Sequence, residues 1–179
     1  MIKIGIKQNL AIVKEVDFGV YLGEPGKEEK VLLPKKQVPE NSKIGDKLTV
    51  FIYRDSEDRL IATTREPKMQ LGEIALLAVK EVNQVGAFCD WGLEKDLFVP
   101  YKEQLFTPEI GKSYLVALYV DKSSRLCGTM RVYDFLQDSA PYKKDDIVQG
   151  VIYEVHSEIG VFVAIDNKYH GVIPSKEVF

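Results

Sequence analysis

The stretch IGDKLTVFIYRDSEDRLIATTR at residues 44–65 returns as IGKSYLVALYVDKSSRLCGTMR at residues 110–131, 66 positions later. In each copy Ile-Gly opens a long apolar run, a polar turn D-x-x-x-R-L follows, and a second run ends at Arg. Two such runs on either side of a turn predict paired β-strands. The tetrapeptide VKEV also recurs, at residues 13–16 and 79–82, with the same offset. A unit of this length exceeds the roughly 20–50 residues of a solenoid repeat, so we expect a tandem array of small domains.

Three further strands are expected ahead of the quoted pair in each unit. A β-branched run, AIVKEV or LAVKEV, is closed by a glycine turn, and short second and third strands follow, the third ending at Pro34 or Pro100. A polar stretch with one helical turn then leads into the quoted stretch. Five strands with a helical turn after the third favour a five-stranded Greek-key barrel, the OB-fold. We therefore expect an all-β chain with repeat one at residues 1–65 and repeat two at residues 70–131.

A third copy begins after a second linker. VIYEVHSEIGVFVAIDNKYHGVIPSKEVF repeats the first three strands, and Gly160 to Pro174 spans the same 14 residues as Gly86 to Pro100. We expect the start of a truncated repeat three at residues 145–179, from a fragment or a short form of a longer protein. Because open strand edges pair readily, these strands should pack on repeat two, pair with another chain or be disordered.

Composition limits the classes of function. The 179 residues are 45% hydrophobic and 28% charged, as in ordinary globular proteins. No apolar run approaches the roughly 20 residues that cross a bilayer, and the N-terminus does not resemble a signal peptide. Cys89 and Cys127 lack metal spacing and predict buried thiols in a reducing compartment, by default the cytoplasm. The net charge of −3 argues against nucleic-acid binding unless a local basic patch exists.

The sequence contains no arrangement typical of catalysis or of a cofactor site. His156 and His170 are the only histidines, and without a nearby cysteine they make a poor zinc site, so we expect both at the surface. The glycines and lysines of residues 23–30 lack phosphate-loop spacing. We expect a non-enzymatic protein without metal or cofactor.

The five strands with these motifs resemble the RNA-binding repeat of the ribosomal S-one family. The shared features are a first strand followed by F-G-V-Y or V-G-A-F, a third strand that ends at Pro, then I-G and D-x-x-x-R-L. The resemblance covers residues 1–131 as two copies and continues into residues 145–179. A tandem of divergent, acidic repeats is most similar to the bacterial conserved virulence factor B family, in which three repeats precede a winged-helix domain.

The resemblance implies a set of RNA-binding residues. In S-one repeats two aromatics flank the glycine turn, a histidine ends strand three, and an Asp and an Arg lie four residues apart. The corresponding residues are Phe18, Tyr21, Asp55 and Arg59 in repeat one, Phe88, Asp121 and Arg125 in repeat two, and Phe162 in repeat three. Val85 and Ile159 replace the first aromatic, and Pro34, Pro100 and Pro174 replace the histidine. Repeat one is therefore nearest the pattern and is expected to carry most of the RNA affinity.

The residues themselves leave alternatives open. Phe18 and Tyr21 are three apart and would face opposite sides of a regular strand, so we expect a bulge at Gly19 to bring both rings to one face. Otherwise one ring fills the barrel. Lys35 follows Pro34 and is a candidate phosphate contact, while Trp91 either stacks a base or packs between domains.

These expectations combine into two hypotheses of function. The first is a non-catalytic, cytoplasmic protein that holds single-stranded RNA with weak to moderate affinity on OB-fold faces and regulates gene expression after transcription. The alternative is a protein-interaction array that docks a ribosomal or RNA-polymerase partner. A basic groove on the strand 2–3 face would favour RNA, and an acidic or apolar one a protein.

Overall fold

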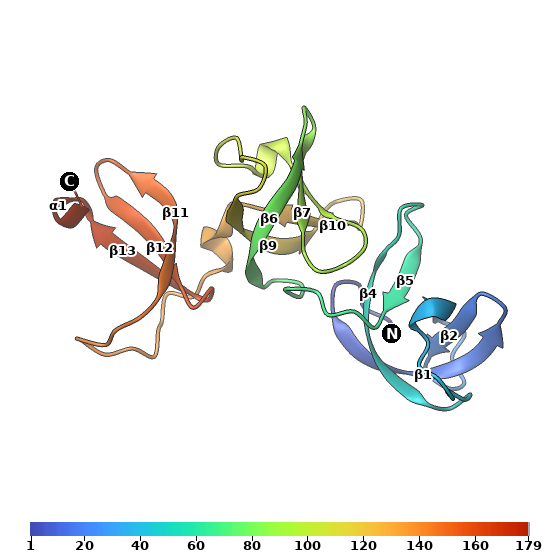
Figure 1. The fold of residues 1–179 in the computed structure, drawn as a ribbon. Coiled ribbons are helices and arrows are strands. Elements are labelled where there is room, and N and C mark those ends of the chain that lie inside the picture. The colour runs from blue at the N-terminus through green and yellow to red at the C-terminus, as the bar shows by residue number, and fades with distance from the viewer. Residues whose placement is uncertain (179) are drawn as a thin grey trace.

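The computed structural model describes residues 1–178 as three β-units that lie in a row (Figure 1). Thirteen strands, three short 3₁₀ turns and one four-residue α-helix, α1 (Ser175–Val178), make up the described part of the chain. The predicted all-β fold class with tandem OB-fold barrels is confirmed. None of the helices within residues 1–178 has the length and apolar character that crossing a membrane requires.

The first unit is a closed five-stranded barrel. Its elements are β1 (Lys7–Val16), β2 (Gly19–Gly23), β3 (Lys30–Pro34), η1 (Lys35–Gln37), β4 (Lys47–Arg54) and β5 (Leu60–Thr63), and the strand order is β1-β2-β3-β5-β4. β3 and β5 close the barrel through a parallel pairing at Leu32 and Ile61. The interior is aliphatic and consists of Leu10, Ile12, Val20, Leu22, Val31, Leu33, Val50, Ile52 and Ala62.

The second unit repeats this order and closes less completely. Its elements are β6 (Ile74–Val82), β7 (Gly86–Asp90), β8 (Leu97–Pro100), η2 (Tyr101–Glu103), β9 (Ser113–Val120) and β10 (Leu126–Thr129), in the order β10-β9-β6-β7-β8. β8 and β10 lie side by side, and Gly128 of β10 is so close to Val116 and Val99 that a Cβ there would lie 2.6 and 2.9 Å from their methyl groups.

One of the sequence recurrences does not correspond to a structural repeat. Both first strands contain a bulge, after Ile12 in β1 and after Val79 in β6, and Ile12 pairs with Leu22 as Val79 pairs with Cys89. Ile12 and Val79 are thus equivalent, 67 residues apart, and both are buried. The two VKEV segments are therefore one position out of structural register. From the third strand onward Pro34 and Pro100 are equivalent, and the offset is 66.

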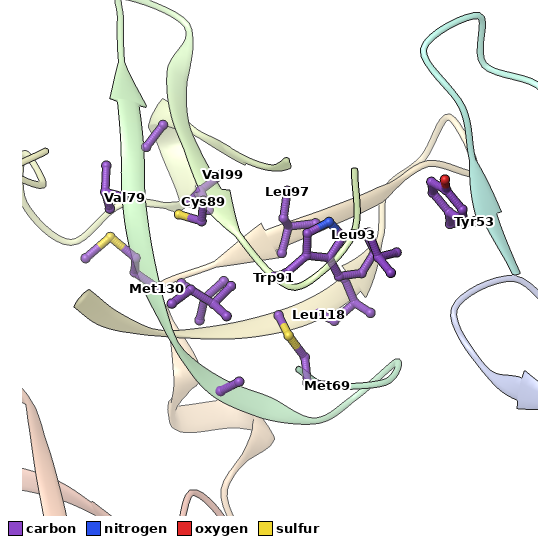
Figure 2. Packing of buried hydrophobic residues seen from close by; sticks show 14 of the residues in the cluster. Tyr53, Met69, Val79, Cys89, Trp91, Leu93, Leu97, Val99, Leu118 and Met130 are labelled. Atoms are coloured by element: carbon purple, nitrogen blue, oxygen red, sulfur yellow. The ribbon is translucent and has the colours of Figure 1, made fainter. Parts of the chain in front are cut away.

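The outer face of β4 joins the first two barrels. Alternate residues of β4 point in opposite directions, so Val50 and Ile52 fill the first barrel while Phe51 and Tyr53 join the core of the second. The Phe51 ring packs edge-on against Trp91, with ring centroids 5.6 Å apart. Figure 2 shows Trp91 and the neighbouring Leu93 among the strands of the second barrel, on the side that faces Tyr53. Trp91 is thus a packing residue between the barrels.

The linker between the barrels is fixed by backbone hydrogen bonds. The N–H of Lys68 donates to the Trp91 carbonyl at 2.8 Å, and the N–H of Gly72 donates to the Leu118 carbonyl at 2.9 Å. Met69 is buried in the same cluster, where Figure 2 shows it next to Leu118. The linker and the outer face of β4 therefore belong to the apolar core of the second barrel, while the interior of the first barrel is a separate cluster.

The third unit packs on repeat two, one of the three outcomes expected for it. It is an open sheet of β11 (Gly150–His156), β12 (Gly160–Ile165) and β13 (Tyr169–Pro174), which follows η3 (Val132–Phe135). Tyr153 and Ala164 of this sheet pack against Leu115 and Ala117 on the outer face of β9 and against Val132. The outer face of the fourth strand is thus the docking surface at both junctions.

Candidate nucleic-acid interface

A row of three directly paired side chains crosses the same three strands in each unit. Directly paired residues of neighbouring strands project from the same face of a sheet. The rows are Lys14, Tyr21 and Leu32 in repeat one, Glu81, Phe88 and Phe98 in repeat two, and Glu154, Phe162 and Val172 in the third unit. Each row carries one predicted RNA-binding aromatic at its centre, and only in repeat one does it begin with a cation.

The aromatic pair of repeat one lies on one face, although not for the predicted reason. The expected bulge at Gly19 is wrong, because the bulge is at Val13 on the partner strand and Phe18 lies in the turn before β2. The Phe18 side chain is 57% exposed and its ring meets Tyr21 edge-on at 6.5 Å, so it does not fill the barrel. The ammonium of Lys30 lies 5.1 Å from the centre of the Tyr21 ring.

The carboxylate of Asp55 is used to build the β4–β5 turn. Its Oδ1 accepts the backbone N–H groups of Glu57 and Arg59 at 2.9 and 3.0 Å, and its Oδ2 accepts the Arg59 Nε at 3.0 Å. Burial opposes ionisation, but these hydrogen bonds outweigh it and lower the pKa of Asp55. The Arg59 guanidinium also contacts Glu57 at 2.8 Å, so its charge is compensated by two carboxylates.

The β9–β10 turn has the same backbone hydrogen bonds, but its arginine side chain is not paired with a carboxylate within residues 1–178. Asp121 Oδ1 accepts the backbone N–H groups of Ser123 and Arg125 at 2.8 and 3.0 Å, and the hydrogen bond from Arg125 lowers the pKa of Asp121. The Arg125 side chain is exposed and forms no ion pair with any residue among 1–178. Within residues 1–178 Arg125 thus has no carboxylate partner, whereas Arg59 has two.

A groove of about 510 Å³ opens on the face of repeat two and is walled partly by repeat one. Its lining includes Phe88, Phe98, Val85, Leu97, Trp91, Lys95, Asp121 and Arg125 from repeat two, and Tyr53, Arg54 and Asp58 from repeat one. Arg54 Nε donates to the Ser124 carbonyl at 3.1 Å, and Lys95 Nζ donates to the Asp55 carbonyl at 3.0 Å. The first bond links the end of β4 to the β9–β10 turn, and the second links the β7–β8 connection to the β4–β5 turn.

The charges of this groove are nearly balanced. The cations are Arg54, Lys95 and Arg125, and the acidic residues are Asp58, Glu81, Asp96 and Asp121. Asp96 is paired with Lys80 at 3.4 Å, and Asp121 is engaged by its own turn. The basic groove that would favour RNA most strongly is therefore not present on repeat two.

Lys35, the lysine predicted to contact phosphate, is accessible, whereas its neighbour Lys36 is engaged in an ion pair. Lys35 is exposed at the start of η1, and Lys36 forms an ion pair with Glu94 of repeat two at 2.6 Å. Sequence reasoning missed Lys14 and Lys30, which lie beside Tyr21. The sequence signal for both is the alternation of side chains along a strand, which places Lys14 of β1 and Lys30 of β3 on the two sides of Tyr21 in β2.

Phe162 of the third unit lies among other aromatic side chains. Its ring lies 4.4 Å from His156 and 5.1 Å from His170, and Tyr133 of η3 approaches it at 6.3 Å. His170 also lies 2.9 Å from the Tyr153 hydroxyl, and His156 lies 3.1 Å from Glu154. Both histidines are thus half-buried beside Phe162, and the His156 side chain is still 38% exposed.

Both cysteines are buried, and burial raises the pKa of each thiol to about 11. A thiol with such a pKa is almost fully protonated near pH 7, and the thiolate is the nucleophilic form. Neither Cys89 nor Cys127 is thus suited to nucleophilic chemistry.

Comparisons with known proteins agree with this architecture. An uncharacterized protein, YitL, of Bacillus subtilis is 28% identical over 174 residues, which are 91% of this chain and 57% of that protein. Conserved virulence factor B of Staphylococcus aureus is 22% identical over 134 residues, which are 70% of this chain and 45% of that protein. The chain thus spans about half the length of these curated relatives, and the resemblance to the conserved virulence factor B family is confirmed.

A solved structure shares the arrangement along almost the whole chain. A multidomain protein with nucleic acid binding domains from Streptococcus pneumoniae superposes with a TM-score of 0.65 at 24% identity, covering 98% of this chain and 64% of that one. The family model of the S1 domain matches residues 4–65 and 71–131, which contain the two barrels. The chain belongs to the S1 domain family.

Proposed function

We propose that this chain binds single-stranded RNA, without catalysis, across the faces of repeats one and two. The observation that carries the proposal is the exposed pair Phe18 and Tyr21, flanked on neighbouring strands by Lys14 and Lys30. Aromatic faces stack bases and nearby cations contact phosphates, which is how single strands are held without sequence preference. We place the protein in the cytoplasm, as a regulator of gene expression after transcription.

Membership of the S1 domain family and the solved neighbour, described as having nucleic acid binding domains, support this proposal. The proposed interface keeps five of the residues first implied by the sequence: Phe18, Tyr21, Lys35, Phe88 and Arg125. Asp55 and Asp121 support it by forming their turns, and Arg59 is left out because two carboxylates compensate its charge. Phe162 is left out because aromatic neighbours surround it.

Phe18→Ala and Tyr21→Ala are each expected to weaken RNA binding by about 1–3 kcal/mol, because each ring offers one base a stacking surface. Fluorescence anisotropy with a labelled, unstructured ten-nucleotide RNA measures the loss. Because Phe18 is exposed, its truncation should leave the melting temperature nearly unchanged, so lost affinity reports lost contact. If both variants are folded and bind RNA as the wild type does, the proposed face of repeat one is wrong.

The balanced charges of the groove favour one alternative occupant, a protein segment. A face with four carboxylates and three cations attracts a polyanion weakly and tolerates a mixed-charge partner. The two candidates differ in their salt dependence, because a single strand releases counterions from each phosphate contact and a peptide of balanced charge does not.

A further inference from the structure

We infer that repeat two binds an acidic segment of a protein partner at a pair of cations that lies outside the proposed RNA interface. The pair consists of Lys102 in η2 and Arg131, which follows β10, and both line a hollow of about 240 Å³. Both side chains are exposed, and neither forms an ion pair with a carboxylate within residues 1–178. The inference does not depend on RNA binding, because it uses none of the residues assigned to that interface.

The arginine of this pair has a structural equivalent in repeat one. Thr63 Oγ1 accepts the backbone N–H of Arg65 at 3.1 Å, and Thr129 Oγ1 accepts the backbone N–H of Arg131 at 3.0 Å. Both arginines thus follow the fifth strand of their barrel and leave it through the same hydrogen bond.

The lysine has an equivalent as well. The hydroxyls of the same two threonines donate to the last residue of the 3₁₀ turn, Gln37 at 2.6 Å in repeat one and Glu103 at 2.8 Å in repeat two. Lys36 and Lys102 directly precede these residues. Repeat one therefore carries the same pair of cations at the same place in its barrel.

In repeat one this pair holds a carboxylate that comes from another domain. Glu94 lies in the connection between β7 and β8 of repeat two, and its Oε1 is 2.6 Å from Lys36 Nζ and 3.4 Å from Arg65 Nη2. The hydrogen bond from Lys36 lowers the pKa of Glu94, so the carboxylate is ionised. The neighbouring Trp91 and Leu93 are buried in the apolar core. The ligand of this pair is thus a glutamate on a chain segment that also makes apolar contacts.

The hollow in repeat two offers both kinds of contact. Arg131 is held beside η2, because its Nε and Nη2 each donate to the Lys102 carbonyl at 3.4 Å. Tyr101 and Phe106, which are 68% and 47% exposed, form the aromatic part of the lining. An incoming segment can therefore place a carboxylate on the cations and an apolar side chain on the two rings.

An acidic protein segment suits this hollow better than an RNA strand. Glu103 stands where repeat one has the neutral Gln37, and the added negative charge beside Lys102 repels a polyanion more than it repels one carboxylate. Arginine and aromatic residues are also enriched at protein interfaces. The third unit supplies no carboxylate to the pair within residues 1–178, so the site is open to a partner.

The test uses the peptide DWGLEKDL, residues 90–97, which contains the glutamate that the pair in repeat one holds. Titration of the unlabelled peptide into the isotope-labelled full chain locates its site by amide chemical shifts, and anisotropy of a labelled peptide gives the affinity. We expect shifts at Lys102, Phe106 and Arg131. The same peptide with glutamine in place of its glutamate should bind about fivefold more weakly.

Variants of the chain separate this site from its equivalent in repeat one. Because an exposed ion pair contributes up to about fivefold, the double variant Lys102→Gln with Arg131→Gln should bind the peptide about tenfold more weakly. Lys36→Gln is the matched control and should stay within about twofold of the wild type, since Glu94 already occupies that site. All three substitutions change exposed side chains, so their results do not depend on a perturbed fold.

The double variant is also titrated with the labelled ten-nucleotide RNA, and its affinity should equal that of the wild type. If the peptide does not bind, or if its chemical shifts lie away from Lys102 and Arg131, the inference is wrong. A tenfold loss of RNA affinity in the double variant would show that the pair contacts phosphate, and it would overturn the inference while leaving the proposed function intact. Loss of RNA binding in Phe18→Ala bears on the proposed function alone.

Discussion

Replacing Phe51 with alanine is expected to lower the free energy of unfolding by about 3–5 kcal/mol, the usual cost of truncating a buried phenylalanine. Phe51 is fully buried, yet it points away from the interior of its own barrel and packs on Trp91 of the next. Its loss leaves a cavity in the core that the two barrels share. The variant should also move Trp91 emission to longer wavelength, because water gains access to the junction.

Urea denaturation followed by circular dichroism and by Trp91 emission measures this effect. Phe18→Ala is the matched control, since it removes the same side chain from an exposed position and should cost less than about 0.5 kcal/mol. If Phe51→Ala and Phe18→Ala both lowered the free energy of unfolding by the same small amount, the barrels would not be joined by a cooperative core. The groove between them would then lose its physical basis.

Gly19→Ala is expected to destabilise the first barrel by more than the roughly 1–3 kcal/mol of ordinary backbone strain. Gly19 has φ of +153°, and a Cβ there would lie 2.1 Å from the Leu33 carbonyl oxygen and 3.0 Å from the Lys35 nitrogen. These are backbone atoms, so no side-chain movement relieves the overlap. β2 and β3 would have to separate at the place where Phe18 and Lys35 are positioned by a 2.9 Å hydrogen bond between their backbones.

The control for this variant is Gly45→Ala. Gly45 also has a positive φ, +96°, but a Cβ there meets nothing within 4 Å, so this substitution adds conformational strain without overlap. The difference in urea midpoint between the two variants isolates the cost of the close approach. Equal midpoints would show that β2 and β3 can separate without penalty and that the turn does not fix Phe18.

Strand order and turns could be predicted because they depend on local chemistry. Ile-Gly, the D-x-x-x-R turn and the following strand recur in residues 44–65 and 110–131, and the turns have the same hydrogen bonds in the structure. The VKEV recurrence misled because the connection from Leu22 to Val31 is one residue longer than the equivalent connection from Cys89 to Leu97, so that the structural offset is 67 before it and 66 after it. Burial is the better guide to equivalent positions, since Ile12 and Val79 both lie in the interior of their barrels.

The candidate site could be predicted only in part. The ring pair follows from the glycine turn, but the groove depends on how one barrel packs against the next. A signal for that packing was present: VFIY at residues 50–53 and LVAL at residues 115–118 are apolar without alternation, which is typical of strands buried on both faces. The pattern indicates that β4 and β9 have covered outer faces, but not which residues cover them.

The most direct test of RNA binding is a titration of the wild-type chain with single-stranded RNA, single-stranded DNA and duplex RNA of equal length, at low and at physiological salt. We predict that the single strands bind more tightly than the duplex, because stacking on Phe18, Tyr21 and Phe88 needs unpaired bases. The log–log salt slope should be about −0.7 for each phosphate contacted. Binding to the duplex as tight as to the single strands, or single-strand binding that does not change with salt, would contradict the account.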